Sequence, residues 1–256
     1  DLSAFRAEAL YTTQKLVQEL SEREKNWEEA VINGLLMPPD CESSVSIISF
    51  MGRRVLHEEL PVLWQFSPWK LIYSTRFHGS SYSNMLATCQ REVSSKRSEG
   101  KKTKMILLME VDNSTASPGE HRGVDDGARL VIGACLSDPI ATGSVRFYGG
   151  STTFVFQLHT PSMSIHPQIC VYHATGDNEK YISCTPQRLA IGGGGGCSIF
   201  LDNTLSHGST AKCATFGSPP LSLWSGDTSC ERVLDEEAPG LVCSFDIRTL
   251  EVIVVE

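Results

Sequence analysis

The first 34 residues carry apolar side chains at helical spacing, while charged side chains occupy most positions between them. The apolar stripe consists of Leu16, Leu20, Trp27 and Val31. Such a pattern predicts an amphipathic helix that ends at Gly34 and is followed by a linker to residue 40. The stripe packs either on the rest of its own chain or on a partner protein, and the pattern alone leaves both options open.

From residue 41 onward the pattern changes to a few short helices and many strands. Helical spacing predicts helices over Gly52–Leu63, with a stop near Pro61, and over Tyr82–Val93, with Ser80 or Ser81 as the cap. The β-branched and aromatic run Trp69–Ser74 predicts a strand. Ten further strands are predicted: Lys104–Val111, Leu130–Leu136, Val145–Tyr148, Phe154–His159, Ile169–His173, Lys180–Cys184, Arg188–Ile191, Ser198–Leu201, Leu241–Phe245 and Glu251–Val255.

Short strands separated by turn signals favour a mainly β fold with peripheral helices, built as a two-sheet antiparallel sandwich over residues 41–256. Strands do not alternate with helices, which argues against a doubly wound α/β fold. The polar stretches Ser94–Lys104, Asp112–Ala128 and Asp227–Gly240 are expected to be surface loops.

The run of five glycines, Gly192–Gly196, raises the question of a phosphate-binding loop. Such a loop needs a lysine followed by serine or threonine and opens a helix. Here Cys197 and a strand-like run follow instead. The glycines are therefore interpreted as a turn between two antiparallel strands.

Composition and charge exclude several classes of function. The formal net charge is -8, which disfavours nucleic acid as the main ligand. The chain has neither an initiator Met nor an apolar signal segment, so it is expected to be a processed or excised piece, and no apolar run is long enough to span a membrane.

No motif argues for catalysis, a cofactor or a metal. The pattern G-x-S-x-G does not occur, and Cys170 and His173 on one strand would point to opposite faces. The nine cysteines lack a C-x-x-C pair and are interpreted mainly as buried free thiols of a reducing compartment, with a disulfide framework as the alternative.

Six ordered segments resemble the TLDc domain family. They are WKLIYST with HGSS (Trp69 to Ser81), FYGGSTTFVF (Phe147 to Phe156), LAIGGGGGCSIFLD (Leu189 to Asp202), LSHGST (Leu205 to Thr210), CATFGSPPL (Cys213 to Leu221), and FDI with LEV (Phe245 to Val252). The chain looks like a divergent member, because the tryptophan that the family usually has after V-Y is missing where Val171-Tyr172 leads into His173-Ala174, and Ile253 replaces the usual final aromatic residue.

The resemblance implies a β-sandwich and a non-enzymatic protein-interaction module. Family members are linked to oxidative-stress resistance, and several bind the vacuolar-type proton pump, so pump subunits are the expected partner and the cytoplasm or an organelle surface the expected location. The stripe of Leu16, Leu20, Trp27 and Val31 is the expected partner contact. Motif residues interpreted as structural are Trp69, Tyr73, His78, Gly79, Tyr148, Gly149, Gly192, Gly193, Gly194, Asp202, Gly208, Ser209 and Phe216.

Two alternatives stay open. One is a structural subunit of another large assembly, cytoskeletal or ciliary. The other is a redox-responsive protein that uses a reactive cysteine, which would need an exposed thiol with a lowered pKa.

Overall fold

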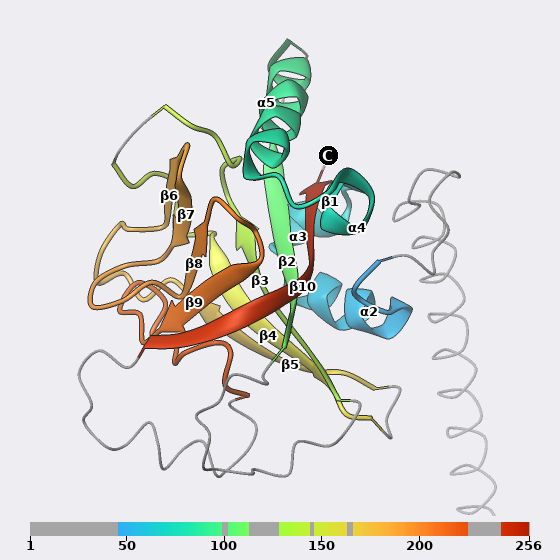
Figure 1. Cartoon of the computed structure of the whole chain (residues 1–256), viewed down its shortest axis with the longest axis vertical. Helices are drawn as coiled ribbons and strands as arrows, with labels where there is room; N and C mark the ends of the chain where they lie inside the picture. The colour runs from blue at the N-terminus through green and yellow to red at the C-terminus, as the bar shows by residue number, and fades with distance from the viewer. Residues whose placement is uncertain are drawn as a thin grey trace, which may run out of the picture.

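Figure 1 shows the computed structural model of the chain, which describes residues 46–98, 102–112, 128–143, 146–162, 166–224 and 242–255. The described helices are α2 (Phe50–Glu59), α3 (Val62–Gln65), α4 (Thr75–His78) and α5 (Tyr82–Ser98). The described strands are β1 (Trp69–Ser74), β2 (Lys104–Asp112), β3 (Arg129–Leu136), β4 (Phe154–Thr160), β5 (Gln168–His173), β6 (Ile182–Thr185), β7 (Arg188–Ile191), β8 (Ile199–Asp202), β9 (His207–Ala211) and β10 (Val242–Val255). None of the helices among these residues has the length and apolar character needed to cross a membrane.

Strand β10 belongs to both layers of the molecule. Its first part pairs with β9, and its second part pairs with β2 on one side and β1 on the other. The strand order is β5-β4-β3-β2-β10-β9-β8-β7-β6, and every pairing is antiparallel. The two halves of this order form the two layers that Figure 1 shows, so the predicted antiparallel sandwich with peripheral helices is confirmed.

The two faces of the β2 layer are both buried, each by a different partner. Leu107 of β2 lies in an inner core between the two layers, together with Ile132, Val155, Leu189 and Leu201. Its neighbours Ile106 and Leu108 lie in an outer core, together with Phe156, Leu56, Leu60 and Trp64. Because side chains alternate along a strand, burial of both faces explains why β2 reads as a continuous apolar run.

Helices α2 and α3 cover the outer face, and the sequence explains where α2 begins and ends. The hydroxyl of Ser49 accepts a hydrogen bond from the Gly52 N–H at 3.2 Å, which caps α2. Leu60 is extended and Pro61 has no N–H to continue the ladder, so α2 ends at Glu59. The predicted stop near Pro61 is therefore confirmed. The predicted helix Gly52–Leu63 was wrong in extent, because α2 begins at Phe50 and a second helix, α3, follows Pro61.

Helix α5 confirms the predicted helix Tyr82–Val93 and runs on to Ser98. Ser81 is its cap, since its hydroxyl accepts from the Asn84 N–H at 3.3 Å. The expected loop Ser94–Lys104 was wrong at both ends, because its start is helical and Lys104 opens β2.

Three expectations about strands were wrong. Leu241–Phe245 and Glu251–Val255 were predicted as separate strands but are parts of the single strand β10. In the polar middle of β10 the pairing with β2 shifts register between Ile247 and Thr249. No strand was predicted over His207–Ala211, which forms β9. Tyr148 makes only an isolated bridge to Ile182, so no strand ends there.

Candidate functional site

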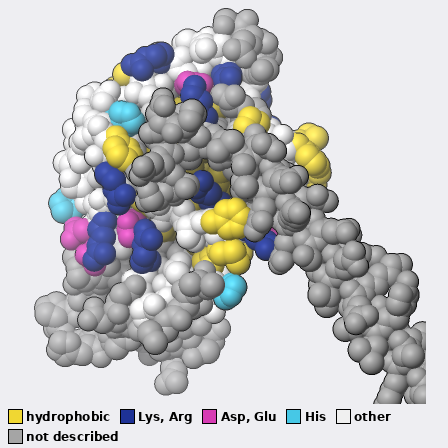
Figure 2. Space-filling view, turned by 90° about the vertical axis from the view of Figure 1, so that its right-hand side faces the viewer, with side chains coloured by type: hydrophobic (Ala, Val, Ile, Leu, Met, Phe, Trp, Pro, Cys, Tyr) yellow, Lys and Arg dark blue, Asp and Glu magenta, His cyan; other side chains and the backbone are white. Residues whose placement is uncertain are grey.

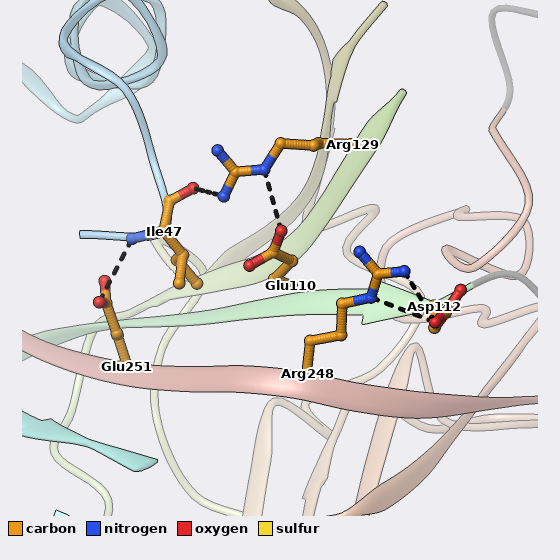
Figure 3. Close-up of polar contacts among 6 residues, drawn as sticks. All are labelled: Ile47, Glu110, Asp112, Arg129, Arg248 and Glu251. Atoms are coloured by element: carbon orange, nitrogen blue, oxygen red, sulfur yellow. Dashed lines mark hydrogen bonds and ion pairs between the residues drawn. The ribbon is translucent and has the colours of Figure 1, made fainter. Parts of the chain in front are cut away.

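A buried carboxylate on β10 holds the chain that leads into α2. Alternation places Glu251 on the outer face of the sheet with Ile253 and Val255, and its side chain is fully buried. Its carboxylate accepts a hydrogen bond from the Ser46 hydroxyl at 2.9 Å. It also accepts one from the Ile47 N–H at 3.3 Å (Figure 3). The outer face of β10 thus fixes the first described residues.

Arg129 of β3, the strand beyond β2 in the sheet, holds the other side of the same residue. The Arg129 guanidinium donates to the Ile47 carbonyl at 3.0 Å and to the Glu110 carboxylate at 2.9 Å (Figure 3). Both backbone polar groups of Ile47 are therefore bonded to ionisable side chains of the sheet. We call Ser46, Ile47, Glu110, Arg129 and Glu251 the Ile47 latch.

Electrostatics in the latch oppose ionisation of its buried acid. Burial raises the pKa of Glu251 above its ordinary value. Hydrogen bonds from Ser46 and Ile47 and the charges of Arg53 and Arg76 act in the opposite direction but do not cancel the effect of burial. The pKa of Arg53 is in turn lowered by burial, with Glu251 as the opposing influence.

Replacing Arg129 by alanine is expected to lower the free energy of unfolding by about 1–3 kcal/mol, because the carbonyl of Ile47 loses its partner. Urea unfolding followed by circular dichroism measures the change. Arg248→Ala is the matched control: Arg248 also pairs with a carboxylate, Asp112 at 2.9 Å, but it is more exposed and does not touch Ile47 (Figure 3). The control should cost at most about 1 kcal/mol, and equal losses for the two variants would contradict the latch.

Sequence reasoning missed the latch. The available signal was a single acid, Glu251, inside the apolar run that ends the chain, and a single acid, Glu110, inside the apolar run of β2. A carboxylate buried in a strand needs hydrogen-bonding partners. The sequence indicates that need but not the partners, which lie 204 positions away in the case of Ile47.

The glycine run is the predicted turn between antiparallel strands, joining β7 to β8. Gly192 donates its N–H to the Tyr181 carbonyl at 2.9 Å, and Gly193 donates to the Thr215 hydroxyl at 2.9 Å. A Cβ on Gly192 would lie 2.5 Å from the sulfur of Cys213. The run therefore directs two N–H groups into the protein and packs closely against the segment around Thr215, which is a structural role.

The motif residues that follow β1 hold the turn into α5. The Tyr73 hydroxyl donates to the carbonyls of Gly79 and Ser81. The His78 ring stacks on Tyr73 with centroids 5.4 Å apart, and its Nδ1 lies 3.0 Å from the Ser74 N–H. Gly79 has φ 75°, a conformation that favours glycine.

The remaining motif residues also contact nearby backbone or core. The Asp202 carboxylate accepts from the N–H and hydroxyl of Thr204, which closes the turn after β8. A Cβ on Gly208 would lie 2.5 Å from the Phe245 ring. Trp69 and Phe216 are buried. The Tyr148 hydroxyl bonds to the backbone of Ala141, and Gly149 has φ 99°. Ser209 is the strand-pairing partner of Ser244 in β10 and of Phe200 in β8.

These motif residues do not meet in one place. Gly192 and Phe216 are close neighbours, but Tyr73, His78 and Gly79 lie around β1 and α4, in another part of the fold. The expected partner contact, formed by Leu16, Leu20, Trp27 and Val31, lies outside the described residues, as do Cys41 and Cys230.

The seven described cysteines are free thiols. Burial raises the pKa of Cys89 to about 12 and also raises the pKa values of Cys135, Cys184, Cys197 and Cys243. A raised pKa lowers the thiolate fraction and with it the nucleophilicity. At these positions the structure disfavours a reactive cysteine.

The described residues also contain no cluster of three or more His, Cys, Asp or Glu side chains suited to a metal ion.

Comparison with known proteins matches residues 42–256 to a family model described as the TLDc domain. Among curated relatives, "Oxidation resistance protein 1" of Bos taurus is 33% identical over 156 residues, which are 60% of this chain and 14% of that protein. The protein of the same name from Xenopus tropicalis is 31% identical over 185 residues, 72% of this chain and 18% of that protein. "Nuclear receptor coactivator 7" of Mus musculus is 28% identical over 185 residues, 72% of this chain and 16% of that protein. The chain thus spans less than a fifth of the length of these relatives.

Proposed function

Because the chain belongs to the TLDc domain family, we propose that it is a non-enzymatic protein-binding module that regulates the vacuolar-type proton pump and supports resistance to oxidative stress. Relatives named for oxidation resistance support the proposed role in resistance to oxidative stress. The partner is the one that the resemblance to pump-binding TLDc members implies, and the cytoplasmic face of an organelle is the corresponding location.

A non-enzymatic role is supported by what the family motif residues do. His78, Asp202 and the glycines of the β7–β8 turn each bond to or pack against nearby backbone. His78 ends α4, Asp202 ends β8, and glycine has no functional side chain. A catalytic centre instead needs a nucleophile, a base and a stabilising donor within hydrogen-bond reach of one another.

The observation that carries the proposed mechanism is the Ile47 latch. The latch fastens the chain that leads to residues 1–45 onto the outer face of the sheet. In our proposal the stripe of Leu16, Leu20, Trp27 and Val31 contacts one pump subunit while the sandwich docks on its neighbour. A module that binds one state of the pump more tightly than another shifts the equilibrium by the difference in binding free energy.

Replacing the four stripe residues by serine in the full chain is expected to reduce recovery of pump subunits at least about tenfold, because apolar anchors carry most of the binding energy at interfaces. Pull-down from detergent-solubilised organelle membranes with quantitative mass spectrometry measures recovery. The control variant carries Gln at Glu19 and Glu28, on the charged face of the same segment.

Equal recovery by the stripe variant and the native chain would remove the stripe from the mechanism. Recovery of cytoskeletal or ciliary subunits in place of pump subunits would replace the proposal with a structural role in that assembly.

A further inference from the structure

Helix α3 and its C-cap residue, Phe66, present large apolar side chains to solvent. Val62, Leu63 and Phe66 are 67%, 82% and 84% exposed, whereas Trp64 between them is only 5% exposed. Three bulky hydrophobic side chains with this exposure within five positions form a contiguous apolar surface. Surfaces of this kind mark sites of association.

Packing and hydrogen bonds hold the backbone that carries Val62, Leu63 and Phe66. Trp64 anchors the turn in the outer core. The Gln65 side chain donates to the Leu60 carbonyl at 2.8 Å, and the Gln65 carbonyl lies 2.7 Å from the His57 ring nitrogen. Inward packing of one residue and these bonds keep Val62, Leu63 and Phe66 directed outward.

Lysines lie beside this apolar surface. Lys104, which opens β2, holds its ammonium group 5.1 Å from the centre of the Trp64 ring, and within the described part of the chain it forms no ion pair. Burial and the charge of nearby Lys102 lower the pKa of Lys104. Lys102 pairs with Asp138 but stays 71% exposed, so its ammonium group retains free donors.

Strand pairing brings these groups to one end of the molecule. Trp69 and Lys104 are both register partners of Val255, on opposite sides of β10. Figure 1 shows the start of β1 and the start of β2 beside the end of β10, and Figure 2 shows exposed hydrophobic side chains next to Lys and Arg on the side that carries α2 and α4.

We infer that Val62 and Leu63 of α3 and Phe66 at its C-cap form, with Lys102 and Lys104, a docking surface for an anionic phospholipid bilayer. The apolar side chains enter the boundary between headgroups and acyl chains. The lysines bury their methylene stems beside them and present ammonium groups to the lipid phosphates and carboxylates. A protein with net charge -8 needs such a local cationic surface to approach an anionic membrane.

Co-sedimentation of the full chain with vesicles tests this surface. Binding is expected on phosphatidylcholine vesicles that contain phosphatidylserine, and much less on pure phosphatidylcholine. The double variant Leu63→Ser/Phe66→Ser should lose about tenfold or more in partition coefficient, because two apolar side chains no longer leave water. Lys104→Gln should lower the partition coefficient severalfold. Added salt should weaken vesicle binding by the native chain, because it screens the attraction between the lysines and the anionic lipids.

Val242→Ser is the matched control. Val242 is 59% exposed, but it opens β10, whereas Val255 beside Lys104 ends that strand, about 40 Å farther along an extended chain. The control should bind like the native chain. Glu59→Gln should bind more tightly, because Glu59 is an exposed acid three positions before Val62.

Three outcomes would overturn the inference. The first is equal binding to neutral and anionic vesicles, and the second is unchanged binding by Leu63→Ser/Phe66→Ser. The third is a dimer in analytical ultracentrifugation that this double variant abolishes, which would assign the surface to a second copy of the chain. Soluble glycerophosphoserine should not compete with vesicles, and full competition would reduce the site to a headgroup pocket.

Discussion

Replacing Gly192 by alanine is expected to lower the free energy of unfolding by about 2–5 kcal/mol, because the substitution combines backbone strain with a steric clash. Gly192 has φ 81°, a conformation that residues with a Cβ rarely adopt. A Cβ there would also lie 2.5 Å from the Cys213 sulfur and 3.1 Å from the Phe216 ring, in the inner core.

Two neighbouring glycines separate these contributions. Gly195 has φ 122°, but its Cβ would meet nothing closer than the Lys212 carbonyl at 3.9 Å. Gly195→Ala therefore tests backbone strain alone and should lower the free energy of unfolding by about 1–3 kcal/mol. Gly196 lacks a positive φ, but its Cβ would lie 2.5 Å from the Ala211 Cβ. Gly196→Ala therefore tests the steric clash alone and should also lower the free energy of unfolding by about 1–3 kcal/mol.

Urea unfolding of the three variants measures these costs, with Gly150→Ala as the control. Gly150 has no positive φ, and its Cβ would meet only the Ser137 hydroxyl at 3.6 Å, an ordinary contact. We expect the largest loss for Gly192→Ala and almost none for Gly150→Ala. If Gly192→Ala cost no more than Gly195→Ala, close packing of the turn on Cys213 would be refuted.

The strands that the sequence predicts well are those whose own side chains decide burial. β1 and β7 were predicted with the bounds that they have, Trp69–Ser74 and Arg188–Ile191. In β7 the three buried side chains, Leu189, Ala190 and Ile191, are apolar, so local composition carries the information.

The strand that sequence reasoning missed depends on its neighbours. β9 has the sequence HGSTA, which has the small and polar composition of a turn. It is a strand because β8 and β10 supply pairing on both sides and because Gly208 lets the Phe245 ring approach closely. Tertiary pairing overrides a weak local preference here.

The middle of β10 illustrates a different limit. Asp246, Arg248 and Thr249 are polar and predict a break, yet they lie where β10 passes from one layer to the other. Asp246 contacts His207 at 2.6 Å, and Arg248 contacts Asp112. A polar stretch at such a crossing cannot be distinguished from a loop by composition alone.

Replacing Glu251 by alanine is expected to lower the free energy of unfolding by about 3 kcal/mol, because the Ile47 N–H and the Ser46 hydroxyl lose their acceptor in a buried place. Equilibrium unfolding in urea near neutral pH measures the loss. Glu251→Gln, which keeps the shape and one carbonyl acceptor, should lose much less. Equal losses for the two variants would show that the carboxamide oxygen cannot replace the carboxylate in the latch.

The pH dependence of the same pair tests ionisation of Glu251 directly. Burial raises its pKa in the folded protein above the ordinary value of 4.5 that applies when the chain is unfolded. Between these two values the folded protein binds more protons than the unfolded chain, so this residue makes stability fall as pH rises through that window. The native chain should therefore lose stability relative to Glu251→Gln from about pH 4.5 upward until the folded pKa is passed. A difference between the two proteins that is constant with pH would show that Glu251 titrates alike in both states, and the latch would then hold a carboxylate without any electrostatic cost.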